Sequence, residues 1–512
     1  MATSICSKKP NISLCADRSS NVPICWHRAT LRFTFPGLSS FPLSAFLITI
    51  DPAIVMSTAS LEGRGRLLVV IRPSAFSRLP LYEWMKAQGF TVAMVYPSSG
   101  PFAPWDAPGL FDHWINSETC DPDALDRALR DYADAHHLTS RVAAIFTFDE
   151  YGVYPAAVVA QRWGLRSLPF EPELISTMNN KHAFRDWCVT NGVRGPRSAA
   201  ISERDVLAAK TEVDRVAVIE RLLAAKGIQL PVIVKPAAGA GKIQISRAAS
   251  LEEVLRRLLA LFDALRQHAD FKHLRFDEAG VVTALVEEYI GGDEVDIDCI
   301  IDHGVVRFAS ISDNFPSPYV QPVEVGGLAP SALTTSAQVA LHQLLRDYVD
   351  RCPSLHGVLH FEAKYDYDRG HAYVIEVNCR MGSAETFTMV QSAFGVHLGE
   401  AVVRCVLGEP LGPYPHDGSP GGSRPTQDYF ASVNIYVSKA GVLRRRELPV
   451  AAAHWVDGGY TAAAAIGSAV LPPTRMGRMV AWIVARGPTA EAARRHVEAL
   501  TAAATFDVES TE

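Results

Sequence analysis

The sequence lacks the features that mark nucleic-acid-binding, membrane-spanning and disulfide-rich proteins. Its 49 Lys and Arg residues are outnumbered by 55 Asp and Glu residues, and they form no basic stripe that could neutralise the phosphates of a nucleic acid. The nine cysteines are scattered without a C-x-x-C pair, which favours a reducing compartment. No apolar run approaches the roughly 20 residues of a membrane helix. We therefore expect a cytoplasmic protein without a nucleic-acid or membrane partner.

Two common catalytic patterns are also missing. There is no G-x-S-x-G elbow of the kind that presents a nucleophilic serine. Gly241 and Lys242 are followed by Ile243, where a Walker-type phosphate loop needs Ser or Thr and the start of a helix. The chemistry must therefore be sought in another arrangement of residues.

The N-terminal end differs in composition from the rest of the chain. The first 55 residues are rich in Ser and Cys, and their acids are Asp17 and Asp51. This composition is typical of an organelle transit segment. The alternative is an upstream extension of the gene, with Met56 as the working start. We expect residues 1–64 to form an extension outside the folded protein.

The folded pattern begins with alternating strands and helices. An apolar run with β-branched residues is followed by a helical stretch over Leu79–Gln88, which Gly89 ends. The predicted strands are Arg66–Ile71, Thr91–Tyr96 and Val142–Phe148. A helix over Pro155–Trp163 follows. Residues 65–175 therefore read as a parallel-sheet domain. Ligand-facing residues are expected at the carboxyl ends of its strands, where Asp149, Glu150 and Tyr151 stand.

The pattern changes after about residue 176 to helix, then strands, then helix. Ser250 and Glu253 form a capping box ahead of an amphipathic helix, and a further helix is expected over Ala337–Val349. Strands are predicted at Val232–Lys235, Ala284–Ile290, Val295–Ile301, Gly357–Tyr365 and Ala372–Asn378. The Pro- and Gly-rich stretch Gly408–Pro425 reads as a linker to a closing α+β piece. That piece is predicted to hold strands at Ser432–Val437 and Met479–Ala485 and a helix at Thr489–Leu500.

Two predicted strands carry the strongest chemical signal. Alternation places Glu376 and Asn378 on one face of their strand, and Glu362 shares a face with His360 and Lys364. If the two strands are antiparallel neighbours, Glu362, Glu376 and Asn378 converge as hard oxygen donors, which suit magnesium and the phosphates of ATP. The alternative is a pair of solvent-facing acids on edge strands.

Other residues could contact the phosphates or the base of a nucleotide. Lys181 and Lys235 are candidate phosphate partners, and the small-residue loop with Gly239 and Gly241 could present backbone N–H groups. Arg380 follows Asn378 closely enough to hold a phosphate or an anionic intermediate. Adenine and ribose contacts are expected from the strand end and the next strand at Glu287, Ile290 and Glu294. Taken singly, Lys181 and Arg380 are more often solvated surface charges, and Glu287 and Glu294 are more often acids on edge strands.

These pieces, in this order, resemble the ATP-grasp superfamily over roughly Arg66–Val508. The matching stretches are Asn180–Arg185, Val232–Pro236, Val286–Glu294, His360–Glu362 and Val374–Arg380. The resemblance implies an α/β protein with α+β pieces and the ATP-grasp fold. Its parts are a parallel-sheet domain over 65–175, an ATP-grasp domain over 176–410 and a C-terminal α+β lobe over 411–512.

The resemblance also implies a role for each matching residue. Lys181 and Lys235 would contact the ATP phosphates, Glu287 with the backbone of Ile290 would read adenine, and Glu294 would take the ribose. Glu362, Glu376 and Asn378 would hold two magnesium ions, with Mn²⁺ as an alternative ion. Arg380 would steady the acyl phosphate or the tetrahedral intermediate, so that Arg380 and Glu376 are the expected catalytic residues.

Within the superfamily, the sequence is similar to carnosine synthases and bacterial L-amino-acid ligases. The similar stretches are Ser312–Asn314, Val323–Gly326, Ala329–Ser331 and Glu362–Lys364 with Glu376–Gly382. This similarity implies that Glu324 and Arg380 bind substrate. Two departures stand out. Lys242, Ile243 and Gln244 stand in the loop where relatives usually carry Ser and Gly, and Ser383 follows Gly382 where carnosine synthases have a second Gly.

The expected activity is an ATP-dependent carboxylate–amine ligase. It would join an amino acid to a second amino acid or amine through an acyl phosphate and release ADP and phosphate. One alternative is an ATP-grasp ligase that acts on a scaffold other than an amino acid. Another is a nucleotide-binding regulator without turnover. Its partners would be small-molecule acids and amines, with a homodimer as an alternative to a monomer.

Overall fold

The computed structural model describes most of the chain after residue 60. The described residues are 61, 63–72, 78–97, 109–237, 245–267, 281–318, 323–383, 385–414, 419, 426–449, 455–462, 464–473 and 478–510. Residues Ala59–Glu512 form one compact unit, to which the following description applies. The first 60 residues of the predicted extension and the loop with Gly239 and Gly241 lie outside the described residues.

The first sheet is parallel, as the β-α-β pattern predicts. Its strands, in spatial order, are β3 (His113–Asn116), β2 (Thr91–Tyr96), β1 (Leu67–Ile71) and β4 (Val142–Phe146). Every residue of β1 is buried, because helices cover both faces of a parallel sheet. These helices are α1 (Leu79–Ala87), α2 (Pro122–Ala135) and α3 (Val153–Arg162). The sequence analysis found β1, β2, β4, α1 and α3, but it missed the short β3 and α2.

A second sheet of four strands is antiparallel throughout. It consists of β5 (Ser198–Ser202), β8 (Thr283–Glu288), β6 (Val232–Pro236) and β7 (Ser246–Ala248), in this spatial order. The helices beside it are α6 (Glu203–Leu207), α7 (Glu212–Ala225) and α8 (Leu251–Gln267). The predicted capping residues lie at the start of α8. The Ser250 hydroxyl accepts a hydrogen bond from the Glu253 N–H, whereas the Glu253 carboxylate accepts from the N–H of Ala249 rather than from Ser250.

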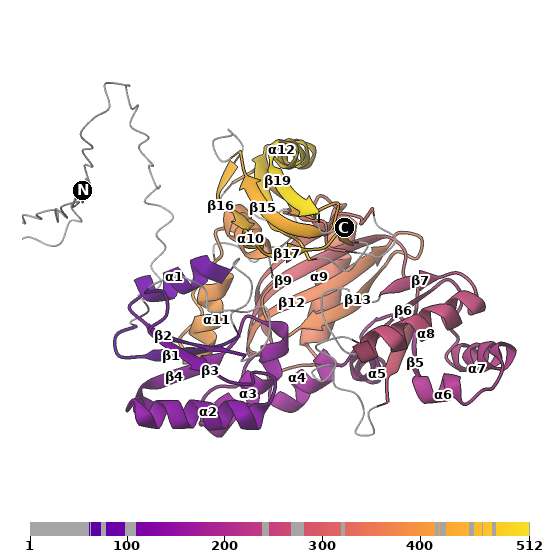
Figure 1. The fold of residues 1–512 in the computed structure, drawn as a ribbon, viewed down its shortest axis with the longest axis horizontal. Coiled ribbons are helices and arrows are strands. Elements are labelled where there is room, and N and C mark those ends of the chain that lie inside the picture. Colours follow the sequence, from indigo (N-terminus) through magenta and orange to yellow (C-terminus); the bar gives the residue numbers. More distant parts are fainter. Residues whose placement is uncertain are drawn as a thin grey trace, which may run out of the picture. The chain divides into compact units, whose positions relative to one another are not determined.

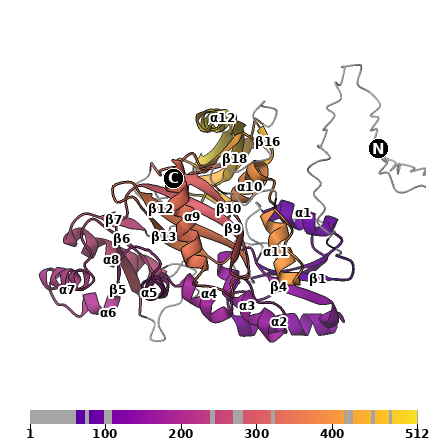
Figure 2. The same ribbon diagram turned by 180° about the vertical axis from the view of Figure 1, so that it is seen from behind.

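The largest sheet has eight antiparallel strands and runs through the middle of the described unit (Figure 1). Its spatial order is β13 (His371–Asn378), β12 (Gly357–Asp366), β9 (Asp293–Asp302), β10 (Val305–Asn314), β11 (Gly327–Ala329), β14 (Tyr429–Ile435), β18 (Ala481–Gly487) and β16 (Trp455–Ala462). Helix α9 (Thr335–Val349) packs against one face of this sheet, over β10, β12 and β13 (Figure 2). Its buried residues Ala337, Leu341, Leu345 and Tyr348 recur at helical spacing and face the core.

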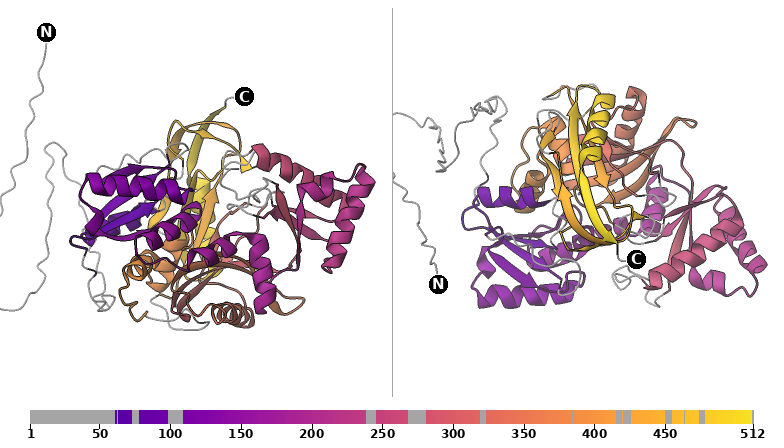
Figure 3. Two further views of the ribbon diagram at one scale, coloured as in Figure 1. Left: turned by 90° about the horizontal axis from the view of Figure 1, so that it is seen from below. Right: turned by 45° about the horizontal axis from the view of Figure 1, so that its top comes forward.

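Shorter elements connect and complete these sheets. The helices are α4 (Pro172–Asn179) and α5 (Lys181–Asn191), which lead to the second sheet, and α10 (Thr386–Phe394) and α11 (Leu398–Leu407). Near the C-terminus, β17 (Ala469–Val470), β15 (Gly441–Glu447) and β19 (Thr505–Ser510) form a small sheet beside α12 (Ala490–Ala503). These C-terminal elements form one group with β14 and β18 (Figure 3).

The large sheet crosses one of the boundaries expected from the sequence. β14, β16 and β18 follow residue 410, yet they continue the sheet that holds β12 and β13. The domain divisions after 64, 175 and 410 stay predictions. None of the helices in the described ranges is long and apolar enough to span a membrane.

The turn between β8 and β9 generates a test of the fold. Gly292 has φ +74, and an added Cβ would lie 1.8 Å from the carbonyl oxygen of Tyr365 in β12. We expect Gly292→Ala to lower the free energy of unfolding by about 1–3 kcal/mol, because the strand ends must move apart. Urea unfolding measures the change. Gly291→Ala is the matched control, since its Cβ would have no neighbour within 4 Å; equal losses in both variants would contradict the described turn.

Candidate functional site

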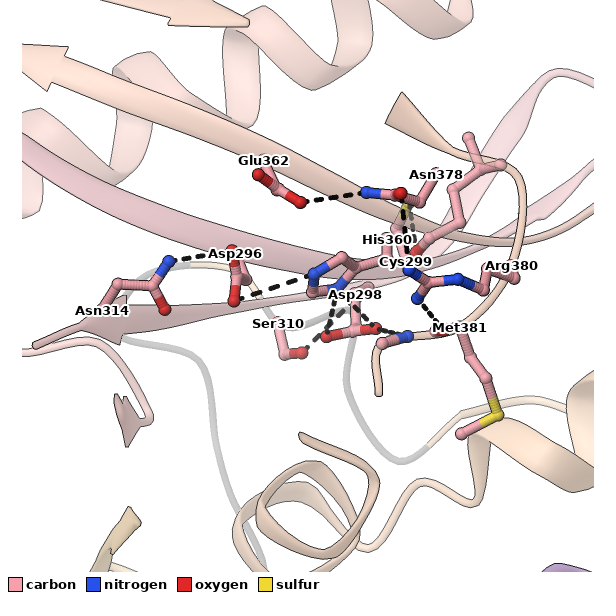
Figure 4. A network of polar contacts seen from close by, with 12 residues as sticks. Asp296, Asp298, Cys299, Ser310, Asn314, His360, Glu362, Asn378, Arg380 and Met381 are labelled. Atoms are coloured by element: carbon pink, nitrogen blue, oxygen red, sulfur yellow. Dashed lines mark hydrogen bonds and ion pairs between the residues drawn. The ribbon is translucent and has the colours of Figure 1, made fainter. Parts of the chain in front are cut away.

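The two strands predicted to carry the metal ligands are antiparallel neighbours. Glu362 of β12 lies opposite Glu376 of β13, and His360 lies opposite Asn378. Directly opposed residues in such a pair have Cβ atoms about 5 Å apart. The Asn378 side chain donates a hydrogen bond to Glu362 Oε1 at 3.0 Å (Figure 4). The convergence of Glu362, Glu376 and Asn378 expected from alternation is therefore present in the structure.

Strand β9 adds two acids that the sequence analysis missed. Asp298 lies opposite His360, and Asp296 lies opposite Glu362. His360 Nδ1 is 3.3 Å from Asp298 Oδ1, and its Nε2 is 3.8 Å from Asp296 Oδ2 (Figure 4). Burial by itself would lower the pKa of His360, but Asp298 and Asp296 outweigh it and raise this pKa to about 10. His360 is therefore an imidazolium that neutralises part of the acidic strand. The spacing of Glu294, Asp296 and Asp298 at every second residue was a signal that could have revealed this face.

Lys181 reaches the acids from helix α5. Asn180 caps this helix by accepting hydrogen bonds from the N–H groups of His182 and Ala183, which fixes Lys181 in the first turn. Its Nζ lies 2.8 Å from Glu376 Oε1. Burial opposes the charged form of both partners, yet their attraction raises the pKa of Lys181 and lowers that of Glu376. The ammonium and the carboxylate are therefore both charged.

Lys235, Glu287 and Arg185 form a buried charged triad. Glu287 Oε2 lies 2.6 Å from Lys235 Nζ, and Glu287 Oε1 lies 2.7 Å from Arg185 Nε. The three side chains are 4% exposed or less. Burial would raise the pKa of Glu287, but Arg185 and Lys235 lower it, so that the carboxylate is ionised. Arg185 also donates from Nη2 to the carbonyl of Ile375 in β13 at 2.6 Å, which connects this triad to the large sheet.

Arg380 brings the parallel sheet into the same site. Its Nε lies 2.7 Å from Glu150 Oε2, and its Nη2 lies 3.4 Å from the side-chain oxygen of Asn378. Glu150 begins a short 3₁₀ turn (Glu150–Gly152) after the carboxyl end of β4. Burial raises its pKa despite the opposing effect of Arg380. As expected for the carboxyl end of a parallel strand, Glu150 follows β4 and faces the site.

The remaining predicted residues are placed as follows. Ile290 is buried directly after β8, and Glu294 lies in β9 opposite Lys364. Glu324 is exposed, and its backbone carbonyl accepts hydrogen bonds from Asn434 and Tyr436. Cys379 is buried in the core together with residues of α9. Gly239 and Gly241 lie outside the described residues. The nucleotide and substrate roles of Glu287, Ile290, Glu294 and Glu324 stay predictions.

Two further buried residues border the acidic strands and were not found from the sequence. Arg78, which precedes α1, donates from Nη2 to the carbonyl of Gly382 at 2.5 Å. The N–H of Gly382 in turn donates to Asp298 Oδ1 at 2.7 Å. Glu385, at the start of α10, accepts a hydrogen bond from the Ser432 hydroxyl. Nothing in the local sequence pattern distinguishes Arg78 or Glu385 from an exposed charge near a helix end.

The donor set fits a hard divalent cation. Glu362 and Glu376 supply carboxylate oxygens, Asn378 supplies an amide oxygen, and Asp296 stands opposite Glu362 on the next strand. Magnesium is typically held by one or two carboxylates together with water and substrate phosphates. Lysine and arginine nitrogens surround these oxygens, which is the combination that an anionic phosphate chain bound through a metal requires.

The buried triad leads to a stability prediction. Glu287→Gln removes the negative charge that two buried cations share, and we expect a loss of about 3–5 kcal/mol in the free energy of unfolding. The neighbouring Glu288→Gln is the control. Glu288 pairs with Arg197 and Arg369, both of which reach solvent, so its loss should stay within about 1 kcal/mol. Urea unfolding of both variants measures the difference, and similar losses would contradict the triad.

Glu385 leads to a prediction on pH. Burial raises its pKa from the ordinary 4.5 to about 7, so the folded protein favours the protonated acid. This contribution to stability is complete below pH 4.5 and is lost as the pH rises through 7. Glu385→Gln mimics the protonated form. The free energy of unfolding of this variant, relative to that of the wild type, should therefore rise between pH 5 and pH 8, by roughly 3 kcal/mol at most. Thermal unfolding across this range provides the test, and parallel profiles would contradict a buried acid.

Comparison with known proteins assigns the fold. Residues 228–388 match the family model of the ATP-grasp domain. Over 187 residues the chain is 26% identical to Carnosine synthase 1 of Gallus gallus, and this match covers 36% of the chain and 20% of that protein. The chain thus spans about a fifth of the length of this relative.

Solved structures extend the similarity to most of the chain. The L-amino acid ligase from Bacillus licheniformis superposes with a TM-score of 0.69 at 18% identity, covering 87% of this chain and 99% of that chain. The biotin carboxylase domain of 2-oxoglutarate carboxylase from Hydrogenobacter thermophilus superposes with a TM-score of 0.63 at 17% identity. This match covers 86% of this chain and 90% of that chain. At these identities the matches establish the fold. They confirm the fold expected from the sequence: the chain has the ATP-grasp fold, and residues 228–388 match the ATP-grasp domain model.

Proposed function

We propose that this protein is an ATP-dependent carboxylate–amine ligase that activates an acid as an acyl phosphate. The observation that carries this proposal is the convergence of Glu362, Glu376 and Asn378 with two cations, Lys181 from α5 and Arg380 just after β13. Oxygen donors for a metal and nitrogen donors for phosphates stand together in one buried site. The fold alone would not assign a function, because one fold can host many reactions.

Lys181 and Lys235 are the proposed partners of the ATP phosphates. Lys181 stands 2.8 Å from Glu376, and Lys235 stands 2.6 Å from Glu287, so each ammonium is held in place by a carboxylate before ATP binds. Such preorganised cations stabilise the charge of a transferring phosphoryl group without reorganisation at the moment of reaction. Ile290 and Glu294 lie at the adjoining ends of β8 and β9, where they would contact adenine and ribose. Gly239 and Gly241 are proposed to cover the phosphates.

Glu362, Glu376 and Asn378 are the proposed magnesium ligands. The biotin carboxylase domain named above was solved with magnesium ADP, which supports this cofactor for the shared fold. When bound, magnesium neutralises phosphate charge and orients the terminal phosphoryl group. The opposition of Glu362 and Glu376 across two strands would let two ions share them. His360, charged between Asp296 and Asp298, holds the neighbouring strands in register beneath the ligands.

The proposed reaction has two displacements. A carboxylate oxygen of the acid attacks the terminal phosphorus of ATP, the bond from this phosphorus to the bridging oxygen breaks, and ADP leaves. The nitrogen of an amine then attacks the acyl carbon, the carbon–oxygen bond to phosphate breaks, and phosphate leaves as the nitrogen loses a proton. Arg380 would stabilise the anionic acyl phosphate and tetrahedral intermediate, with Glu150 fixing its guanidinium.

An amino acid is the proposed acid, and a second amino acid or an amine is the proposed acceptor. The relatives named carnosine synthase and L-amino acid ligase support this choice. Glu324, exposed three residues before β11, is the proposed contact to the substrate amine.

Product analysis tests the proposed function. The full chain is incubated with magnesium ATP and amino acids, singly and in pairs, while ADP and phosphate are measured and amides are sought by mass spectrometry. We expect release that depends on a particular pair and yields a new amide. Glu362→Gln and Glu376→Gln should each reduce turnover at least about a hundredfold, because the phosphate charge is no longer neutralised.

The control is Glu498→Gln, an exposed residue of α12 whose side chain is 56% exposed. Its turnover should equal that of the wild type. Amide formation with a non-amino-acid scaffold alone would replace the proposed substrate class. Nucleotide binding without turnover across a broad panel of acids and amines would contradict the ligase and favour a regulator.

A further inference from the structure

A second group of metal-ligating side chains lies at the other end of strand β9. Asp302 is the last residue of β9, His303 follows it with φ 49, and His356 directly precedes β12. Pairing brings them together, because β9 is hydrogen-bonded to β10 on one side and to β12 on the other, with Gly357 opposite Ile301. The group lies six residues beyond Asp296, or about 20 Å along the strand, and is therefore separate from Glu362, Glu376 and Asn378.

The distances between the possible ligand atoms of this group are close to those of a metal site. One possible ligand atom from each of the three residues lies within 4.8 Å of the others. Asp302 Oδ1 is 2.8 Å from His303 Nδ1 and 3.3 Å from His356 Nδ1. Two ligands held about 2.1 Å from a tetrahedral metal lie about 3.4 Å apart. A small movement of the exposed His303 side chain would bring the three atoms to that spacing.

The buried environment of His356 independently indicates that a metal ion could bind there. The residue is 7% exposed, and its buried Nδ1 has no hydrogen-bond partner, although it faces Asp302 at 3.3 Å. A buried polar nitrogen without a partner is costly, and coordination would satisfy it.

The surroundings of Asp302 determine which of its oxygens is available. Asp302 Oδ2 accepts hydrogen bonds from Arg307 Nε at 3.2 Å and Nη2 at 2.9 Å. Arg307 thereby orients the carboxylate and directs Oδ1 toward the two histidines, in the manner of the outer-shell contacts of metal sites. The positive charges of Arg307 and of Arg166, which lies near His356, oppose a dication. They predict a modest affinity.

We propose that Asp302, His303 and His356 form a site for a transition-metal ion of the Zn²⁺ class. Two imidazoles and one carboxylate are a ligand set that such ions accept, and His303, with its side chain 68% exposed, leaves the fourth position open to water. A bound ion would join the β9–β10 turn to the start of β12. The site would therefore stabilise the end of the large sheet that lies away from the phosphate-binding residues.

A metal titration tests this site apart from the proposed ligase activity. The full chain is stripped with a chelator and kept in excess Mg²⁺ and ADP, which would occupy the proposed magnesium site of Glu362 and Glu376. Co²⁺ is then titrated while its visible absorption is followed, and Zn²⁺ is used to displace it. We expect the wild type to bind one equivalent more than His303→Ala, or to bind it at least about tenfold more tightly.

The control variant is His371→Ala, which removes an exposed histidine at the start of β13. It should titrate like the wild type. His356→Ala should lose the same equivalent as His303→Ala, and Zn²⁺ should raise the melting temperature of the wild type but not of His303→Ala. Identical titrations of the wild type and His303→Ala would overturn the proposal and leave Asp302 as the partner of Arg307. Neither result depends on turnover.

Discussion

Compensation of buried negative charge is the constraint on which this structure depends. The pairing of β9, β12 and β13 collects four carboxylates on adjoining strands, and burying such groups without cations costs several kcal/mol per ion. The acids are Asp296, Asp298, Glu362 and Glu376. Their cations come from several segments: His360 lies within the sheet, and Lys181 reaches it from α5. The fold therefore has to bring distant segments to these strands before the acids can be buried.

The same compensation places the parts of the proposed reaction next to one another. Arg185 contacts both Glu287 of the second sheet and the backbone of β13. Arg380 contacts Glu150, which follows the last strand of the parallel sheet. The elements proposed to bind the nucleotide, the metal and the acid are thus joined by charge pairs as well as by apolar packing. The charges that stabilise the fold are the ones that would hold magnesium ATP and the acyl phosphate, so the site is organised before substrate binds.

The sequence predicted the local features of the site better than its distant partners. Alternation correctly placed Glu376 and Asn378 on one face, because a strand has a fixed period of two residues. The partners of Glu287 could not be found in this way, since Arg185 is separated from it by 102 residues and its pairing depends on the tertiary fold. Asp298 was missed because an acid in a strand is usually exposed. The continuation of the large sheet through β14 and β18 likewise rests on pairing between distant segments.

The proposed reaction requires that an oxygen of the acid itself attacks ATP. Isotope transfer tests it most directly, with an acid substrate that carries ¹⁸O in its carboxylate, the paired amine and magnesium ATP. We expect ADP together with inorganic phosphate that contains one ¹⁸O atom, because the attacking carboxylate oxygen leaves with the phosphate. Unlabelled phosphate, or AMP with pyrophosphate in place of ADP, would contradict it.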